Sequence, residues 1–349
     1  MTLPFESAAR EKLGDPLFSY LLGRQGEQAT GADANQEALA PYRLVPHVLT
    51  GANGISTETN LLEQTFAAPL AVGAFAGDRI FHAEGILPLA RACAKARLPL
   101  IVSEETVTPL SEITQVWPQS WFQVRAAGPV RRTFDLIDLA ARCGVKTVVM
   151  TVLAPTHPRP GLQPGGYSIA AEIKARGWTT IGSDGPGVMA LPSFPQWSHA
   201  DFTSVVAHAS RGGIQVVAKG ILSTGDAHRV REAGCGAIMV SNIGLRQTGE
   251  WIRSSDALQE MAGQVAQVPL LLDGGVRRGT DVIKSLCLGA SMAVAVRPFV
   301  TALAAAGQSG VEEVIQAWLD EIAAVSAWMG VERTHDLDRS HLYCERDSR

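Results

Sequence analysis

Eight short apolar runs recur along the chain, and stretches with helical periodicity separate them. The run at residues 146–152 reads Lys-Thr-Val-Val-Met-Thr-Val, and the others are likewise continuously apolar rather than alternating. Parallel strands that are covered on both faces have this character. The predicted strands are 69–75, 99–103, 121–125, 146–152, 215–220, 236–241, 269–273 and 292–297. Their strict alternation with helices predicts an α/β fold, a (β/α)8 TIM barrel, rather than a doubly wound sheet, which usually has fewer strands in this length.

Two regions fall outside this repeat. Residues 1–65 contain helical patches at 5–13, 15–22 and 34–40, so we expect an N-terminal helical cap on one barrel domain at 66–349. Residues 153–197, after the fourth strand, are rich in Pro and Gly and contain one possible helix at 168–176. A connection this long is either a lid or a disordered surface excursion, and both remain open. After it, Ser198 and Asp201 predict the N-terminal cap of a helix through 209.

Composition and charge exclude several classes of function. The formal net charge is −4 and Lys and Arg form no stripe, so nucleic acid is not an expected partner. No uncharged apolar run reaches about 18 residues, which argues against a membrane span. The N-terminus lacks the basic start and apolar core of a signal peptide. The five Cys form an odd set without a CxxC spacing, so we expect a reduced cytoplasmic protein without a metal site.

Polar side chains stand where most of the predicted strands end, the place where such barrels carry their binding groups. These residues are Ser103, Gln123, Thr151, Lys219, Ser241 with Asn242, Asp273 and Arg297, and the first strand ends in Gly-Ala-Phe-Ala at 73–76. The amides and hydroxyls can donate hydrogen bonds to a polar ligand and accept them from it. Lys219 can stabilise a negative charge on a bound ligand, or it can form an ion pair with a barrel carboxylate such as Asp273.

Two segments carry the most specific signals. Residues 237–247 read Ala-Ile-Met-Val-Ser-Asn-Ile-Gly-Leu-Arg-Gln, and residues 273–282 read Asp-Gly-Gly-Val-Arg-Arg-Gly-Thr-Asp-Val. Glycine amides with Arg277 and Arg297 at the ends of strands seven and eight are typical of a phosphate site. With Lys219-Gly220, these segments closely resemble the FMN-dependent α-hydroxy-acid oxidases and dehydrogenases, the glycolate and lactate oxidase family. The resemblance extends from Tyr20 to Ser340-His341.

The resemblance implies FMN as the cofactor, a small anionic substrate and a homotetramer. It places Arg277 and Arg297 on the FMN phosphate and Asp273 on the ribityl chain. The residues expected to contact FMN are Ala74, Phe75, Ala76, Ser103, Gln123, Thr151, Lys219, Ser241, Asp273, Gly275, Arg277 and Arg297.

On the substrate side the chain departs from the family. Tyr20 and Arg246 match residues that bind the substrate carboxylate. Ile243 stands in the place of the catalytic His, Leu153 replaces the Asp that supports it, and Arg125 replaces an active-site Tyr. Because general-base removal typically costs about 10²–10⁴ in rate, simple 2-hydroxy acids are not the expected substrates. Arg125 either faces the substrate or forms an outward ion pair with the cap.

His157, in the long connection, is the candidate for a replacement base. Three functions remain open, and the first is favoured. It is an FMN-dependent oxidoreductase acting on another carboxylate-bearing molecule or biosynthetic intermediate, since an amine, an enol or an internal base in the substrate would need no His. The second is a redox-neutral enzyme comparable to the FMN-dependent isopentenyl diphosphate isomerases, with Arg125 and Arg246 on a phosphate. The third is a non-catalytic flavoprotein that binds a partner chain.

Overall fold

Eight parallel strands form one sheet in the order β4-β11-β10-β9-β8-β7-β6-β5, and a bridge between Val72 and Leu100 joins its two edges. The computed structural model describes residues 3–23, 33–153, 166–183, 197–246, 249–265 and 267–345. The strands are β4 (Leu70–Val72), β5 (Ile101–Ser103), β6 (Trp121–Arg125), β7 (Thr147–Thr151), β8 (Gln215–Ile221), β9 (Ala237–Ser241), β10 (Leu270–Asp273) and β11 (Met292–Ala295). The predicted TIM barrel is confirmed, and only β8 runs one residue beyond its predicted range.

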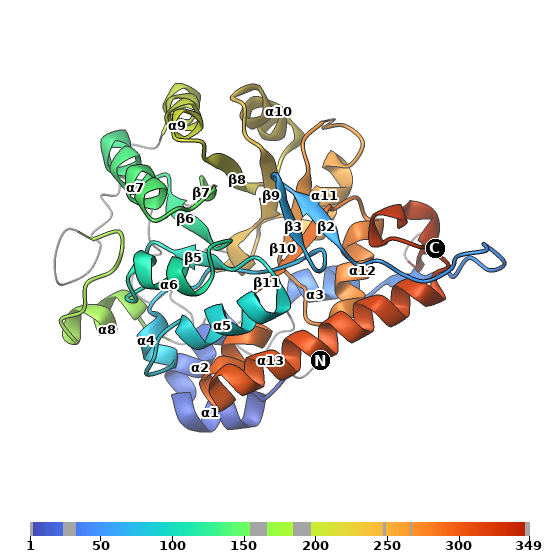
Figure 1. The fold of residues 1–349 in the computed structure, drawn as a ribbon, viewed down its shortest axis with the longest axis horizontal. Coiled ribbons are helices and arrows are strands. Elements are labelled where there is room, and N and C mark those ends of the chain that lie inside the picture. Colours follow the sequence, from blue (N-terminus) through green and yellow to red (C-terminus); the bar gives the residue numbers. More distant parts are fainter. Residues whose placement is uncertain are drawn as a thin grey trace.

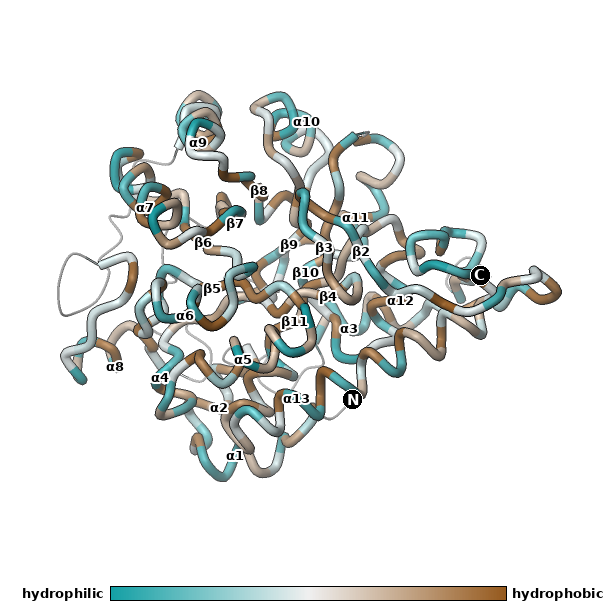
Figure 2. The backbone as a smooth tube through the Cα atoms, in the orientation of Figure 1, coloured by the Kyte–Doolittle hydropathy of each residue, from teal (hydrophilic) through white to brown (hydrophobic). Residues whose placement is uncertain are grey.

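Helices surround the strands (Figure 1). They are α4 (Asp78–Phe81), α5 (Leu87–Ala96), α6 (Leu110–Val116), α7 (Val130–Arg142), α9 (His199–Arg211), α10 (Thr224–Glu232), α11 (Ser254–Met261), α12 (Gly279–Cys287) and α13 (Arg297–Trp328). In α7 the buried Thr133, Leu136, Ile137 and Ala140 follow the spacing of one helical face. Figure 2 shows the same alternation of hydrophobic and hydrophilic segments along α13. The predicted cap of α9 is confirmed as a capping box between Ser198 and Asp201.

The N-terminal end of the barrel is closed by a hairpin that the sequence patterns did not predict. It consists of β2 (Thr59–Leu61) and β3 (Gln64–Phe66), which pair antiparallel. Leu61 and Phe66 pack among the side chains inside the barrel, and Gln64 Nε2 donates to Thr147 Oγ1 at 2.9 Å, where β7 begins. Strands of three residues are too short to show a periodicity. The hairpin leaves the C-terminal end of the barrel as the place for a ligand.

Residues 1–65 do not form a purely helical cap. The helices α1 (Glu6–Leu13), α2 (Asp15–Leu22) and α3 (Ala34–Leu39) lie close to the predicted ranges. Ala9, Leu17, Phe18 and Leu21 pack against Val300 and its neighbours in α13, beside which Figure 1 shows α1 and α2. After them β1 (Tyr42–Leu44) pairs antiparallel with β12 (Leu342–Cys344), so the segment also ties the two ends of the chain together.

The long connection after β7 is described only in part. The predicted helix is α8 (Ile169–Ala175), which begins at Ser168, where the side chain accepts a hydrogen bond from the backbone N–H of Ala171. Residues 154–165 and 184–196 lie outside the described residues, and with them His157. Within the described ranges, no helix combines the length and the apolar character needed to cross a membrane.

Candidate active site

One cavity of about 190 Å³ lies at the C-terminal ends of the strands. Every residue that we expect to contact FMN lines it, with the exception of Ser241. Tyr20, Arg125, Ile243 and Arg246 line the same cavity, so the structure brings the expected cofactor and substrate residues together. Asp33, Asn35 and Glu105 also line it, and the sequence patterns singled out none of these three.

Gln123 and Thr151 form a polar wall at the ends of β6 and β7. Gln123 Nε2 donates to Thr151 Oγ1 at 2.9 Å, and both side chains are buried. With its oxygen already accepting, the Thr151 hydroxyl keeps its hydrogen for another acceptor, and the Gln123 amide keeps a second N–H. These are the groups that a flavin ring with several acceptors requires.

Lys219 near the end of β8 and Asp273 at the end of β10 form an ion pair across the intervening strand β9. Ser241 Oγ donates to the same Asp273 oxygen at 2.7 Å, and the backbone N–H of Ile243 donates to Ser241 Oγ at 3.1 Å. The ion pair weighed as the alternative for Lys219 is therefore present, although Lys219 and Asp273 both line the cavity. Ser241 itself is fully buried, which explains why it does not reach the cavity.

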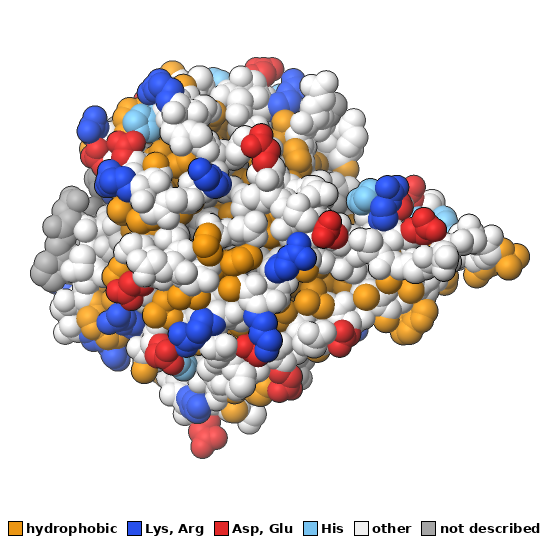
Figure 3. Space-filling view, in the orientation of Figure 1, with side chains coloured by type: hydrophobic (Ala, Val, Ile, Leu, Met, Phe, Trp, Pro, Cys, Tyr) orange, Lys and Arg blue, Asp and Glu red, His pale blue; other side chains and the backbone are white. Residues whose placement is uncertain are grey.

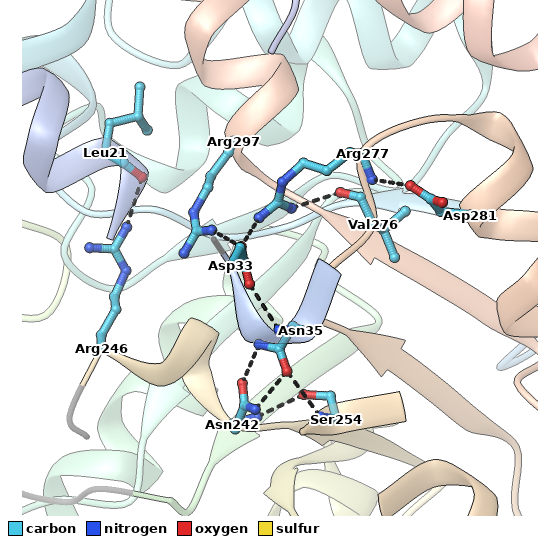
Figure 4. A network of polar contacts seen from close by, with 10 residues as sticks. All are labelled: Leu21, Asp33, Asn35, Asn242, Arg246, Ser254, Val276, Arg277, Asp281 and Arg297. Atoms are coloured by element: carbon cyan, nitrogen blue, oxygen red, sulfur yellow. Dashed lines mark hydrogen bonds and ion pairs between the residues drawn. The ribbon is translucent and has the colours of Figure 1, made fainter. Parts of the chain in front are cut away.

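Arg277 and Arg297 converge on one oxygen of Asp33, Oδ2 (Figure 4). Burial, together with the positive charge of Arg297, lowers the pKa of Arg277 to about 10. Burial opposes the ionisation of Asp33, but Arg297 and Arg277 hold the pKa of its carboxyl below the ordinary value. Two guanidinium groups aimed at one anionic oxygen are the donor set of a phosphate site, with the carboxylate as the stand-in anion.

Gly275 allows the cap to approach this anion site closely. Its φ is 84°, in the left-handed region that favours glycine, and an added Cβ would lie 2.4 Å from the carbonyl oxygen of Asn35. Any side chain at Gly275 would therefore push α3, with Asp33 at its N-terminus, away from the strand end. The glycine at this position is required by the contact as well as by the turn.

Asn35 and Asn242 fasten the cap to the loop after β9. The two amides exchange hydrogen bonds of 2.9 and 2.8 Å, and the backbone N–H of Ser254 donates to Asn35 Oδ1 at 3.1 Å (Figure 4). Asn242 Nδ2 also donates to the Ile252 carbonyl at 3.0 Å. Asn35, Asn242 and Ser254 are buried, and Asn242 holds the loop in place without lining the cavity.

Ile243 adopts a backbone conformation that its side chain disfavours. Its φ is 54°, and Gly244 and Leu245 continue in the left-handed region at 65° and 57°. A β-branched residue is a clear outlier there, at a cost on the order of 1–3 kcal/mol. His, Asn and Asp tolerate this conformation better. The loop therefore turns the side chain at position 243 into the cavity at some cost in strain.

Arg246 connects the loop after β9 to the end of α2. Its Nη1 and Nη2 donate to the carbonyl oxygens of Tyr20 at 2.9 Å and Leu21 at 3.2 Å, and Cζ lies 4.8 Å from the centre of the Tyr20 ring. The last carbonyls of a helix attract a cation. Burial lowers the pKa of Arg246 and raises that of Tyr20. At neutral pH the guanidinium still carries its charge and the phenol keeps its proton.

Arg125 faces Glu105 inside the cavity. Arg125 Nη1 lies 4.0 Å from Glu105 Oε1, and the two side chains are 18% and 19% exposed. Arg125 therefore lines the cavity, and the carboxylate at 4.0 Å comes from the loop after β5 and not from the cap. The neighbouring Glu104 is fully buried, pairs with Arg132 at 2.7 Å and accepts a hydrogen bond from the Arg125 backbone. Two consecutive Glu directly after Ser103 are a sequence signal that could have identified Glu105.

Leu153 does not lie in the lining of this cavity. It packs closely against Gly220 and lines a second cavity of about 370 Å³, together with Val152, Trp197 and Phe202. Ile243 and Leu153, which we predicted from the resemblance to stand in the places of the family's His and Asp, therefore line different cavities. A carboxylate at position 153 would need a rearrangement of this segment before it could support an imidazole at position 243.

Comparison with known proteins gives a consistent result. The family model described as FMN-dependent dehydrogenase matches residues 9–344. A 4-hydroxymandelate oxidase of Amycolatopsis orientalis is 33% identical over 94% of this chain and 93% of its own length. An L-lactate oxidase of Nostoc sp. is 31% identical over 97% and 96%. The crystal structure of a mandelate oxidase with benzoyl-formic acid is 32% identical, with a TM-score of 0.84 over 97% of this chain and 96% of that one.

With its barrel, its anion site and these matches, the chain belongs to the FMN-dependent dehydrogenase family, the α-hydroxy-acid oxidases and dehydrogenases. It is an oxidoreductase, and FMN is its cofactor. Of the three functions that the sequence left open, these relatives support the oxidoreductase. They carry no support for a redox-neutral enzyme or for a non-catalytic flavoprotein.

Proposed function

We propose that this enzyme oxidises a carboxylate-bearing small molecule by a route that needs no imidazole base. The observation that carries the proposal is Ile243, which lines the cavity where the family resemblance places the catalytic His. An isoleucine side chain can neither accept nor donate a proton. Arg246 and Tyr20 support a carboxylate ligand, because a partly buried guanidinium and a phenol lie together at the same wall.

We assign the polar strand ends to FMN. Gln123 and Thr151 would meet the acceptors of the ring, and Lys219 would lie beside it as the cation paired with Asp273. Arg277 and Arg297 would hold the phosphate. FMN supplies an acceptor for a hydride when it is bound. The residues of this chain bind and orient the substrate, and the apolar Ile243 excludes water from one side of it.

The first experiment mixes the FMN-loaded enzyme anaerobically with lactate, glycolate or mandelate. We expect these acids to perturb the flavin spectrum as ligands without bleaching it, because their hydroxyl proton has no acceptor at position 243. Rapid bleaching of the unmodified enzyme by any of them would overturn the proposal. His157 would then be the first residue to replace.

A second experiment compares Ile243→His with Ile243→Asn. Both side chains tolerate the positive φ of this position, but only the imidazole is a base near neutral pH. Ile243→His should recover measurable reduction by a 2-hydroxy acid, whereas Ile243→Asn should not. Equal rates in the two variants would show that relief of backbone strain, and not proton transfer, limits the reaction.

We also propose that the chain assembles with copies of itself. Val48 and Leu49 in the loop after β1 are 78% and 101% exposed, and Trp328 at the end of α13 is 71% exposed. A hydrogen bond of 3.3 Å from His47 N to the Met329 carbonyl joins these two segments. Figure 3 shows hydrophobic side chains at the tip where this loop projects, while charges of both signs are mixed elsewhere on the face. Exposed apolar clusters of this kind support a protein interface.

Light scattering would measure the assembly directly. Leu49→Asp combined with Trp328→Asp should lower the mass of the particle toward that of one chain. An unchanged oligomer would place the interface elsewhere, and a monomeric parent protein would remove the proposal.

A further inference from the structure

Three carboxylates line the cavity, and they differ in how firmly they are held. Asp33 is shared by two guanidinium groups. Asp273 pairs with Lys219 and accepts a hydrogen bond from Ser241. The ion pair of Glu105, at 4.0 Å from Arg125, has by far the longest separation of the three. Glu105 is therefore the cavity carboxylate that can most readily exchange its partner for a ligand.

Glu105 stands at the substrate side of the cavity. Burial raises the pKa of the Tyr20 phenol, the charge of Glu105 raises it further, and Arg246 and Arg125 oppose the rise. Glu105, Arg125 and Arg246 thus act on the same phenol, so two cations and one anion surround it. A ligand with only a carboxylate would be attracted by the two cations and repelled by Glu105. A ligand that also carries an ammonium group would satisfy all three.

We propose that the substrate is a zwitterion of the α-amino acid class, with its ammonium group on Glu105 and its carboxylate on Arg125 and Arg246. This inference rests on the proposed function and names its substrate class. The ammonium and carboxylate of one such molecule lie side by side, as Glu105 and Arg125 do. Binding would therefore place the ammonium group against Glu105 and the carboxylate against Arg125, in place of their mutual contact at 4.0 Å.

An amine also explains why no base is needed at Ile243. The ammonium first gives one proton to Glu105, from which it passes to water. The nitrogen lone pair would then form a C=N bond as the Cα–H bond breaks, and two electrons would leave the substrate as a hydride, for which bound oxidised FMN would be the acceptor. The iminium product takes up water and releases ammonium to give a 2-oxo acid. In a 2-hydroxy acid, the oxygen electron pair that forms the C=O bond becomes available only when the hydroxyl proton is removed. That removal is the task of the missing imidazole.

The test uses the FMN-loaded enzyme and pairs of ligands that share one skeleton, such as phenylglycine with mandelate and alanine with lactate. Anaerobic titration of the flavin spectrum gives a Kd for each. We expect the amino acid of a pair to bind at least about tenfold more tightly than the hydroxy acid, which is a difference of ~1.4 kcal/mol. Glu105→Gln should reverse this order, weakening the amino acid and tightening the hydroxy acid. Glu105→Asp should keep the original preference in reduced form.

The outcomes separate the inference from the proposed function. Binding of the hydroxy acids without any preference for amino acids, in parent and Glu105→Gln alike, would overturn the zwitterion and leave the carboxylate pocket standing. If neither the amino acids nor the hydroxy acids perturb the flavin spectrum, both the zwitterionic substrate and the proposed function are overturned. The reversal of preference in one variant is a readout that a merely misfolded protein does not give.

Discussion

Asp33→Asn should lower the free energy of unfolding of the FMN-free protein and raise the affinity of the protein for FMN. Asp33 Oδ2 accepts from both Arg277 and Arg297, and the three side chains are only 19%, 9% and 11% exposed. Removing the negative charge leaves two buried guanidinium groups without their counter-ion. Breaking a buried ion pair costs about 3–5 kcal/mol, and we expect the lower end because asparagine keeps the helix cap of α3 and one acceptor oxygen.

The gain in FMN affinity follows from the same charge. In the parent protein the phosphate shares Arg277 and Arg297 with a carboxylate, and two negative charges at about 4 Å repel by roughly 4 kcal/mol in surroundings with an effective dielectric constant near 20. Relaxation of the carboxylate away from the phosphate reduces this, so we expect about 1–3 kcal/mol, or roughly 5- to 150-fold in Kd. Riboflavin lacks the phosphate and should gain nothing.

Two measurements check this prediction. Denaturant unfolding of the FMN-free parent and Asp33→Asn proteins gives the loss of stability. Quenching of flavin fluorescence gives Kd for FMN and for riboflavin. If the ratio of the two affinities is the same in both proteins, Asp33 does not share the phosphate site and the reasoning fails. Unchanged stability of the FMN-free variant would be equally damaging.

Other perturbations test the surrounding contacts. Asn35→Ala removes three buried hydrogen bonds to Asn242 and Ser254, and should lower the free energy of unfolding by about 3 kcal/mol in urea; an unchanged midpoint would contradict the amide pair. The pKa of Asp33 is held below its ordinary value, so its ion pairs stabilise the fold fully above about pH 4 and are lost as the pH falls through the lowered pKa. Acid unfolding should therefore be less steep in Asp33→Asn than in the parent, and parallel curves would refute this. Lys219→Met should lower the flavin potential in dye-equilibration measurements and weaken FMN retention; an unchanged potential would mean that the charge of Lys219 is fully neutralised by Asp273.

The barrel could be predicted because each of its strands is marked by a pattern in the local sequence. Each buried strand carries its own run of Val, Ile and Leu, as at 146–152, and each run is followed by its polar strand end. These ends meet in one cavity as a geometric consequence of closing the barrel. The resemblance supplied the roles of individual residues, such as Arg277 and Arg297, that periodicity alone does not give.

The missed residues depend on partners that are distant in the sequence. Asp33 is separated from Arg277 by 244 positions and from Arg297 by 264, and no local pattern marks it as their counter-ion. Glu105 lies two residues beyond the end of β5, whereas we expected a cavity residue only at the strand end itself, Ser103. The placement of Leu153 in the second cavity depends on its packing against Gly220, which a motif comparison does not contain.

The left-handed backbone at Ile243 has an evolutionary consequence. A position released from selection would accumulate the residues that its backbone accepts most easily, which here are Gly, Asn, Asp and His. A strained isoleucine is a poor endpoint for such drift, since it lowers stability without compensation. Its presence implies that an apolar side chain at this point is itself favoured, because an unselected position would move to a residue with less backbone strain.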